Sequence, residues 1–213
     1  MKTRGALTLV FDDGYTAVYE QVIPLLRQYG VRAVFAVPLN TKEIEGQAIT
    51  SPQEWLSIAA RDGHEIVAHG ITHRSFTALS DRELAQELSE PAETLRTSTL
   101  VYPGGAHDDR VVNAAKKHFK AARTVVYGLN NIRPEDQMRL KTINFSKRNF
   151  SVPRANIHAL RVLFQNKWLI ETYHMVSCQP STLKHSVLLD DLEGHLDFIT
   201  SLPTKITTIE EHL

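Results

Sequence analysis

The chain has 213 residues, 42% of them hydrophobic, and this length suits one sizeable α/β domain better than two small ones. Its 24 basic residues balance 24 acidic residues, which excludes a net field for nucleic acid or an anionic membrane surface and favours a small neutral or weakly charged substrate. The single cysteine, Cys178, excludes an intramolecular disulfide, and we expect a buried small hydrophobe at this position.

Apolar strands alternate with amphipathic helices in the first half of the chain. Gly30 is the expected C-cap of the first helix, and a capping-box sequence at 80–83 begins the third. Short apolar runs bounded by turn residues predict strands at 6–11, 33–37, 65–68 and 100–102. Helical spacing of apolar residues predicts helices at 17–29, at 53–61 and from 81 toward 98.

The second half of the chain repeats this alternation. Strands that alternate with helices predict a parallel sheet flanked by helices, either a barrel or a doubly wound sheet. No internal repeat, low-complexity tract or linker interrupts the chain, so we expect a single domain over 1–213. The predicted strands are 121–126, 140–143, 168–173 and 205–208, and the predicted helices are 108–117, 156–165 and 190–201.

Residues 1–5 lead directly into the first strand, without the long apolar stretch and small-residue cleavage site of a signal peptide. The longest apolar runs, such as 168–170, are far too short to span a bilayer. We therefore expect a cytoplasmic protein with no transmembrane segment. The sequence carries no signal for a particular oligomeric state.

Two adjacent carboxylates, Asp12 and Asp13, follow the first strand, although Asp-Asp-Gly is also ordinary turn chemistry. His69 and His73 follow the strand at 65–68, and their spacing would place both imidazoles on one side of a helical turn. Because parallel strands deliver their carboxyl ends to one rim, one carboxylate and the two imidazoles would form three ligands of a catalytic metal. The second carboxylate then has a natural task as general base.

Two further segments end strands at the same predicted rim. The glycines of Tyr102-Pro103-Gly104-Gly105 allow backbone N–H groups to approach a ligand closely, as in an oxyanion hole, although a plain turn is an equal alternative. His174 follows the strand at 168–173 and would point into the rim. A single His at a strand end is more often structural than catalytic, so the catalytic interpretation of His174 depends on the presence of the other motifs.

Taken in order, the segments 11–14, 69–73 and 102–105 and the strand that ends at His174 resemble the polysaccharide deacetylases, the NodB-homology group of carbohydrate esterase family 4. The resemblance spans nearly the whole chain. It implies a distorted parallel (β/α) barrel with about seven strands. It also implies a hydrolase that removes N-acetyl groups from an amino-sugar-containing glycan, with an N-acetylated saccharide as its partner.

The resemblance implies a role for each motif. Asp13, His69 and His73 would hold a divalent transition metal, with Zn²⁺ the usual ion, and Asp12 would be the general base. The metal would polarise the acetamide and lower the pKa of bound water toward ~7.

In the same resemblance the Gly104 backbone N–H would stabilise the oxyanion, and His174 would protonate the departing sugar nitrogen. We expect substrate contacts from Tyr102, Pro103, Gly105 and Tyr173.

The chain departs from the family pattern at several positions. The third motif usually carries an Arg two residues before its proline, and Val101 stands there. Arg123, on the next predicted strand, is our candidate to orient Asp12, although a structural Arg is an equal alternative. Thr172 stands in place of the usual Leu of the acetyl pocket, and the Asp and Trp of the fourth motif have no clear match. These departures bear on the substrate more than on the reaction.

Three other functions stay open at this point. Relatives of the same fold hydrolyse cyclic amides or ureides, some without metal. A non-catalytic glycan-binding relative would also tolerate the missing Arg and fourth motif. A non-haem iron oxygenase uses two His and one carboxylate as well. Among glycans, the sequence favours a soluble or lipid-linked intermediate over an insoluble polymer.

Overall fold

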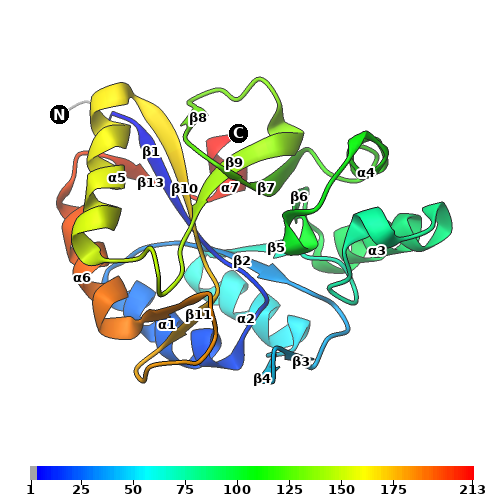
Figure 1. Cartoon of the computed structure of the whole chain (residues 1–213), viewed down its shortest axis with the longest axis horizontal. Helices are drawn as coiled ribbons and strands as arrows, with labels where there is room; N and C mark the ends of the chain where they lie inside the picture. The colour runs from blue at the N-terminus through cyan, green and yellow to red at the C-terminus, as the bar shows by residue number, and fades with distance from the viewer. Residues whose placement is uncertain (1–3) are drawn as a thin grey trace.

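Seven parallel strands close into a barrel in this computed structural model, which describes residues 4–213 (Figure 1). β10 returns to pair with β1 from Ala6 opposite Trp168 to Phe11 opposite Tyr173. This closure confirms the predicted barrel and rules out an open, doubly wound sheet. In spatial order the barrel strands are β1 (Ala6–Phe11), β2 (Val34–Val37), β5 (Glu65–Ala68), β6 (Thr99–Val101), β7 (Ala121–Tyr127), β9 (Leu140–Asn144) and β10 (Lys167–Tyr173).

Helices cover the outside of the barrel, with α5 and α6 on one side and α3 and α4 on the other (Figure 1). The predicted capping box of α3 is confirmed, since Ser80 Oγ accepts the Glu83 N–H. Pro153 is tolerated in the first turn of α5, which therefore begins four residues before its predicted start. The helices are α1 (Thr16–Gln28), α2 (Pro52–Asp62), α3 (Asp81–Leu95), α4 (Asp109–Ala115), α5 (Val152–Gln165), α6 (Leu189–Ser201) and α7 (Ile209–His212).

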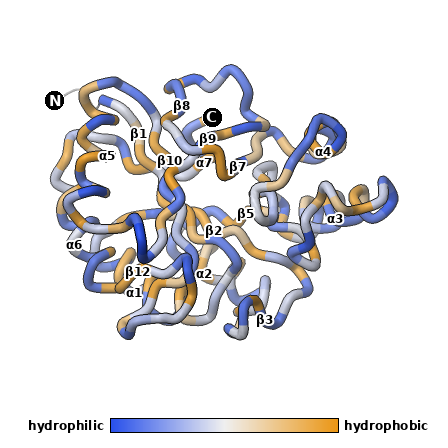
Figure 2. Tube along the Cα trace, viewed as in Figure 1, coloured by the Kyte–Doolittle hydropathy of each residue, from blue (hydrophilic) through white to orange (hydrophobic). Residues whose placement is uncertain are grey.

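The inside of the barrel is packed with apolar side chains. One buried cluster takes members from all seven barrel strands, among them Val10, Val101 and Ile170. Ile209 of α7 joins the same cluster, and the Glu65 carboxylate accepts the Ile209 N–H at 2.8 Å. Figure 2 shows hydrophobic residues along the strands and hydrophilic ones at the outer ends of α3 and α4. Packing fills the interior, so functional groups can gather only at the carboxyl ends of the strands.

Short additional strands distort the barrel at its amino end. β13 (Lys205–Ile206) pairs with the start of β1, whereas β2 pairs with the end of β1. β8 (Asn130–Asn131) pairs antiparallel with the start of β10. Two small sheets lie outside the barrel, formed by β3 (Glu43–Ile44) with β4 (Gln47–Ala48) and by β11 (Met175–Ser177) with β12 (Ser186–Leu188).

Two sequence expectations about single residues need correction. Cys178 is exposed, because it lies on the loop that joins β11 to β12. The sequence did not predict the small sheet that these two strands form. Its N–H donates to Gln21 Oε1 at 2.8 Å. The C-cap of α1 is Tyr29, and Gly30 follows it with a left-handed φ of +63°.

Within the described residues, no helix has both the length and the apolar character needed to cross a membrane. Residues 1–3, which belong to the segment used to predict the location of the protein, lie outside the described residues.

Buried His64 joins the starts of β2 and β5. Its Nδ1 accepts the Ala33 N–H at 3.2 Å, and its ring packs edge-on against Phe35. Burial lowers the pKa of His64 to about 4 from an ordinary value of 6.5. The unfolded chain therefore takes up this proton at a higher pH than the folded protein, and stability falls as the pH drops from 6.5 toward 4.

The substitution His64→Asn keeps an acceptor for the Ala33 N–H and removes the titrating group. Between about pH 7 and about pH 4.5, the free energy of unfolding of the wild type should fall by about 2 kcal/mol more than that of the variant, after allowance for solvent screening. Urea denaturation with a chelator present measures both curves. Parallel pH dependences of the two proteins would contradict this role for His64.

Candidate active site

A cavity of about 490 Å³ opens at the carboxyl ends of the barrel strands. Of the site residues predicted from the sequence, only Pro103 and Tyr173 are not part of its lining. The predicted residues that line it are Asp12, Asp13, His69, His73, Tyr102, Gly104, Gly105, Arg123 and His174. Residues far apart in the chain thus meet at the rim where parallel strands deliver them.

Asp13, His69 and His73 point one ligand atom each toward a common centre. The Nε2 atoms of His69 and His73 lie 3.3 and 3.1 Å from Oδ1 of Asp13. The ligand atoms of all three lie within 4.8 Å of one another, and no other such group of three was found in residues 4–213. His69 Nδ1–H donates to the Val101 carbonyl at 2.8 Å, which leaves its Nε2 lone pair available to a metal.

The segment from His69 to His73 is an irregular loop, so the predicted helical turn is wrong. Left-handed backbone at Gly70 (φ +75°) and His73 (φ +57°) brings the two imidazole rings to 4.9 Å between centres. The buried Glu87 carboxylate, from α3, accepts the Ile71 N–H at 2.5 Å. A residue from a distant helix therefore shapes the loop, and the local spacing of the two His could not indicate this.

The electrostatics of the cluster favour a charged Asp13. Burial alone would raise the pKa of the Asp13 carboxyl, but hydrogen bonds from His69 and His73 and the charge of nearby imidazoles hold it well below its usual value. Burial lowers the pKa of His73, but the hydrogen bond to Asp13 and the charges of nearby carboxylates together outweigh burial, so the net shift is upward. Asp13 thus stays ionised and offers a carboxylate to a bound cation.

Asp12 lies beside this cluster and has a different partner. Arg123 Nη2 donates to Asp12 Oδ1 at 2.6 Å and also contacts Oδ2, with both side chains buried. Arg123 therefore contacts Asp12, as expected for the residue that we selected to orient this carboxylate. His174 Nε2 lies 3.6 Å from Asp12 Oδ2. The two residues predicted to transfer protons thus face each other at one edge of the cluster.

Burial lowers the pKa of His174 from its ordinary value. The carboxylates of Asp12 and Asp13 oppose this shift, and the nearby imidazole of His185 and the Arg123 guanidinium add to it. His174 is therefore a partly buried imidazole whose surroundings favour the neutral form.

The third motif forms a tight turn at the rim. Gly104 is exposed, has a left-handed φ of +60°, and has no heavy atom within 4 Å of where a Cβ would stand, so its backbone is open to the cavity. A Cβ on Gly105 would lie 2.3 Å from Val125, so glycine is required there. Tyr102 donates its hydroxyl to the Met138 carbonyl at 3.1 Å. Pro103 is buried beneath the turn.

Tyr173 lies on the outer side of the barrel wall. Strand alternation directs the flanking Thr172 and His174 inward and turns Tyr173 toward the surrounding helices. Its ring packs against Phe11, and its hydroxyl donates to Glu171 at 3.0 Å. The predicted substrate contact is therefore not made by the Tyr173 side chain.

Five cavity residues were not selected from the sequence: Ile44, Glu45, Val125, Asn144 and His185. Glu45 and Gly46 form the two-residue turn of the β3–β4 hairpin, and both have a left-handed φ. A Glu-Gly pair is a weak hairpin signal that was available in the sequence. His185 comes from the loop before β12, with its ring centre 4.9 Å from that of His174. No local pattern marks it.

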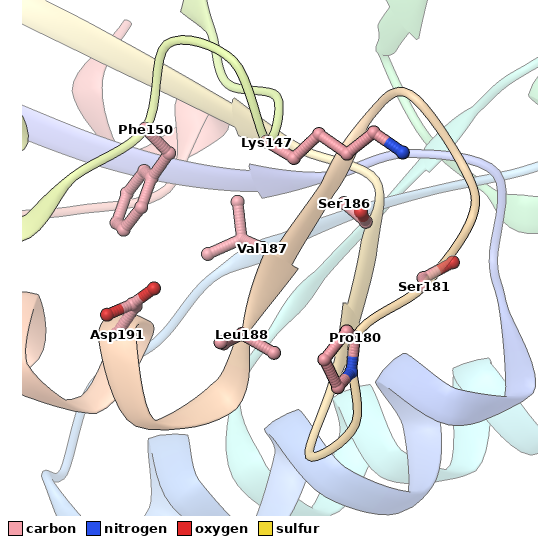
Figure 3. A pocket seen from close by; sticks show the side chains of 8 residues that line it. All are labelled: Lys147, Phe150, Pro180, Ser181, Ser186, Val187, Leu188 and Asp191. Atoms are coloured by element: carbon pink, nitrogen blue, oxygen red, sulfur yellow. The ribbon is translucent and has the colours of Figure 1, made fainter.

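A smaller hollow of about 220 Å³ lies beside β12 and the start of α6 (Figure 3). Phe150 and Val187 contribute apolar surface, and the ammonium of Lys147 points away from Phe150 and donates to the Thr182 carbonyl at 2.8 Å (Figure 3). Its lining contains none of Asp13, His69 and His73. We therefore take the larger cavity as the candidate active site.

The family model for polysaccharide deacetylases matches residues 2–120, which is more than half of the chain. The chain therefore belongs to the polysaccharide deacetylase family, as the resemblance implied. The matched part contains Asp12, Asp13, His69, His73 and Gly104. Arg123, Asn144 and His174 lie beyond it.

Two curated relatives match parts of the chain. The Bacillus subtilis (strain 168) protein YxkH, named as a polysaccharide deacetylase, is 28% identical over 115 residues, 51% of this chain and 40% of YxkH. A gellan lyase from a Bacillus species is 31% identical over 160 residues, 71% of this chain and 6% of that protein. The chain thus spans less than half of either relative.

Solved structures share the fold over nearly the whole chain. The chitin deacetylase of Colletotrichum lindemuthianum has a TM-score of 0.69 at 19% identity, and the superposition covers 100% of this chain and 88% of the deacetylase chain. The Xyl-CE4 domain of a multidomain xylanase from the hindgut metagenome of Trinervitermes trinervoides has a TM-score of 0.64 at 19% identity, covering 98% and 89%. These likenesses extend the shared barrel past residue 120.

If Glu87 shapes the loop between the two imidazoles, Glu87→Ala should weaken Zn²⁺ binding by about 10- to 100-fold, the usual effect of losing an outer partner of a metal ligand. Competition with a chromophoric chelator measures the affinity. Glu90→Ala is the matched control, since Glu90 is an exposed carboxylate on the same helix. Equal affinities in the two variants would contradict the role of Glu87.

Proposed function

We propose that this chain is a metal-dependent hydrolase that removes N-acetyl groups from an amino-sugar-containing glycan and releases acetate and a free amine. One observation carries the proposal: a three-ligand cluster lies beside a separate carboxylate, Asp12, which is held by Arg123 and faces His174. Membership of the polysaccharide deacetylase family supports glycan deacetylation. The catalytic unit would extend over 1–213, because Arg123 and His174 lie beyond residue 120.

The donor set fits a divalent transition metal, and we propose Zn²⁺. One carboxylate oxygen and two imidazole nitrogens are the donors that zinc takes at hydrolytic sites, and three protein ligands leave positions open. Asp13, His69 and His73 would hold the ion, with His69 oriented by its bond to Val101. When bound, such an ion polarises the acetamide carbonyl and makes water easier to deprotonate.

The residues around the cluster supply the proton transfers. Asp12, kept in position by Arg123, takes a proton from the attacking water while the new carbon–oxygen bond forms. Charge that develops on the acetamide oxygen is stabilised by the Gly104 N–H, a contribution of about 3 kcal/mol for one such donor. His174 donates its Nε2 proton to the sugar nitrogen as the carbon–nitrogen bond breaks. Acetate and an amine result.

Charge balance supports an uncharged reacting group. Asp12 is paired with Arg123, and Asp13 would offset only one of the two charges of a divalent ion, so the ion would keep a positive charge for the developing oxyanion. An N-acetylated saccharide satisfies this condition. The cytoplasmic location expected from the N-terminal sequence stays a prediction.

The direct test is acetate release from a panel of N-acetylated saccharides. The wild type should release acetate, a chelator should stop the release, and Zn²⁺ should restore it. Asp12→Asn should lose at least about 100-fold in turnover because it removes the general base. Its metal content should equal that of the wild type, because Asp12 is not one of the three ligands.

Asp190→Asn, which changes an exposed carboxylate on α6, is the control variant. Cyclic ureides belong in the same panel, because ring opening without acetate release would show a different hydrolase. Full activity of Asp12→Asn, or acetate release that survives complete removal of metal, would refute the proposed mechanism.

A further inference from the structure

Eight buried side-chain N or O atoms lack a hydrogen-bond partner in the part of the chain that the structure describes. Three of them belong to residues that line the catalytic cavity: Nε of Arg123, Oδ1 of Asn144 and Nδ1 of His174. Buried polar atoms are nearly always paired in folded proteins, so a concentration of unpaired atoms at one site needs an explanation. Bonds that form only during the reaction would provide one.

Asn144 stands on a rigid part of the rim. It is the last residue of β9, and its Cα pairs with that of Thr172 on β10. Its carbonyl accepts from Asn149 Nδ2 at 2.9 Å, and the next residue, Phe145, donates its N–H to the Thr172 carbonyl at 2.8 Å. The backbone that carries the amide is therefore fixed on both sides.

Asn144 and His174 extend into the cavity from adjacent strands. Thr142 and Thr172, one layer below, share a hydrogen bond of 2.8 Å between their hydroxyls. Asn144 comes two residues after Thr142, and His174 comes two residues after Thr172. Each therefore lies on the same face of its strand as the threonine before it. Asn144 and His174 line the same cavity, and the register that joins the two threonines would bring the amide toward the imidazole.

Donor and acceptor chemistry selects the bond between them. Arg123 Nε–H can only donate, and the terminal nitrogens of this guanidinium already contact Asp12 and the Thr124 carbonyl. Asn144 Oδ1 can only accept, and it is the one acceptor-only atom among the three. A protonated imidazole must donate from both nitrogens, and Nε2 is the one that faces Asp12. Nδ1–H then needs an acceptor, and Asn144 Oδ1 is the unpaired acceptor among these three atoms.

We propose that Asn144 is a positioning residue for His174: its Oδ1 accepts the Nδ1–H bond when the imidazole is protonated and so directs Nε2–H at the departing nitrogen. The inference rests on the proposed function, in which His174 is the general acid. A neutral amide suits this place because Asp12, Asp13 and Glu45 already put three carboxylates at the rim.

The test compares two leaving groups. An amine must be protonated as it departs, whereas the phenolate of para-nitrophenyl acetate leaves without help from an acid. Asn144→Leu should therefore lose about 10- to 100-fold in kcat on an N-acetylated saccharide and less than about threefold on the aryl ester, with KM little changed. Asn144→Asp, which keeps an acceptor oxygen, should recover most of the loss. Thr142→Val, in the layer below, should not change the ratio of the two rates.

A second measurement reads the bond without turnover. In protein with isotope-labelled imidazole nitrogens, the His174 Nδ1 resonance at low pH should shift in Asn144→Leu and stay near the wild-type position in Thr142→Val. Equal loss on both substrates, or an unchanged Nδ1 resonance in Asn144→Leu, would overturn the inference. Absence of acetate release by the wild type would instead refute the proposed function, so the two failures are distinguishable.

Discussion

The pairing of β1 with β10 is the constraint on which the site depends. These strands are far apart in the chain, and their parallel register closes the barrel. The Asp12 N–H donates to the Tyr173 carbonyl at 2.9 Å, which continues the pairing one residue beyond the end of β1. Asp12 and His174 are neighbours for this reason alone. An open sheet would separate β1 from β10 and with them the two residues that we propose transfer protons.

A change of backbone conformation gives two adjacent carboxylates different partners. Asp12 continues the inward face of β1, after Thr8 and Val10, and meets Arg123 across the barrel. Asp13 has a left-handed φ of +74°, which turns its carboxylate toward His69 and His73. Such a conformation costs about 1–3 kcal/mol for a residue with a Cβ and persists where the surroundings fix it. One strand end thereby serves both the metal ligands and the general base.

Much of the fold followed from local patterns in the sequence. Apolar runs gave every barrel strand, and the capping box at Ser80 gave the start of α3, because these depend on neighbouring residues. Closure of the barrel did not follow from periodicity, because β1–β10 pairing is a long-range contact. The resemblance to polysaccharide deacetylases supplied it. The short pairs β3–β4 and β11–β12 carry too few residues for a pattern.

Site residues that directly follow barrel strands could be predicted from the sequence. Features of the site that depend on contacts between distant parts of the chain could not. Asp13, His69 and His73 converge as the strand-end rule requires, but the loop between the imidazoles depends on Glu87. Tyr173 was misplaced although strand alternation from His174 turns it outward.

Asn144 and His185 reach the cavity through pairing and loop geometry that no local pattern encodes. Arg123 was selected because Asp12 needed a cationic partner, and no spacing rule pointed to it.

Anomalous diffraction from crystals grown with Zn²⁺, recorded at the zinc edge, tests the central claim most directly. The account predicts one strong peak within about 2.0–2.2 Å of Asp13 Oδ1 and of Nε2 of both His69 and His73, with Asp12 outside the coordination shell. A peak bound by Asp12 in place of Asp13, or no peak among these side chains, would contradict it.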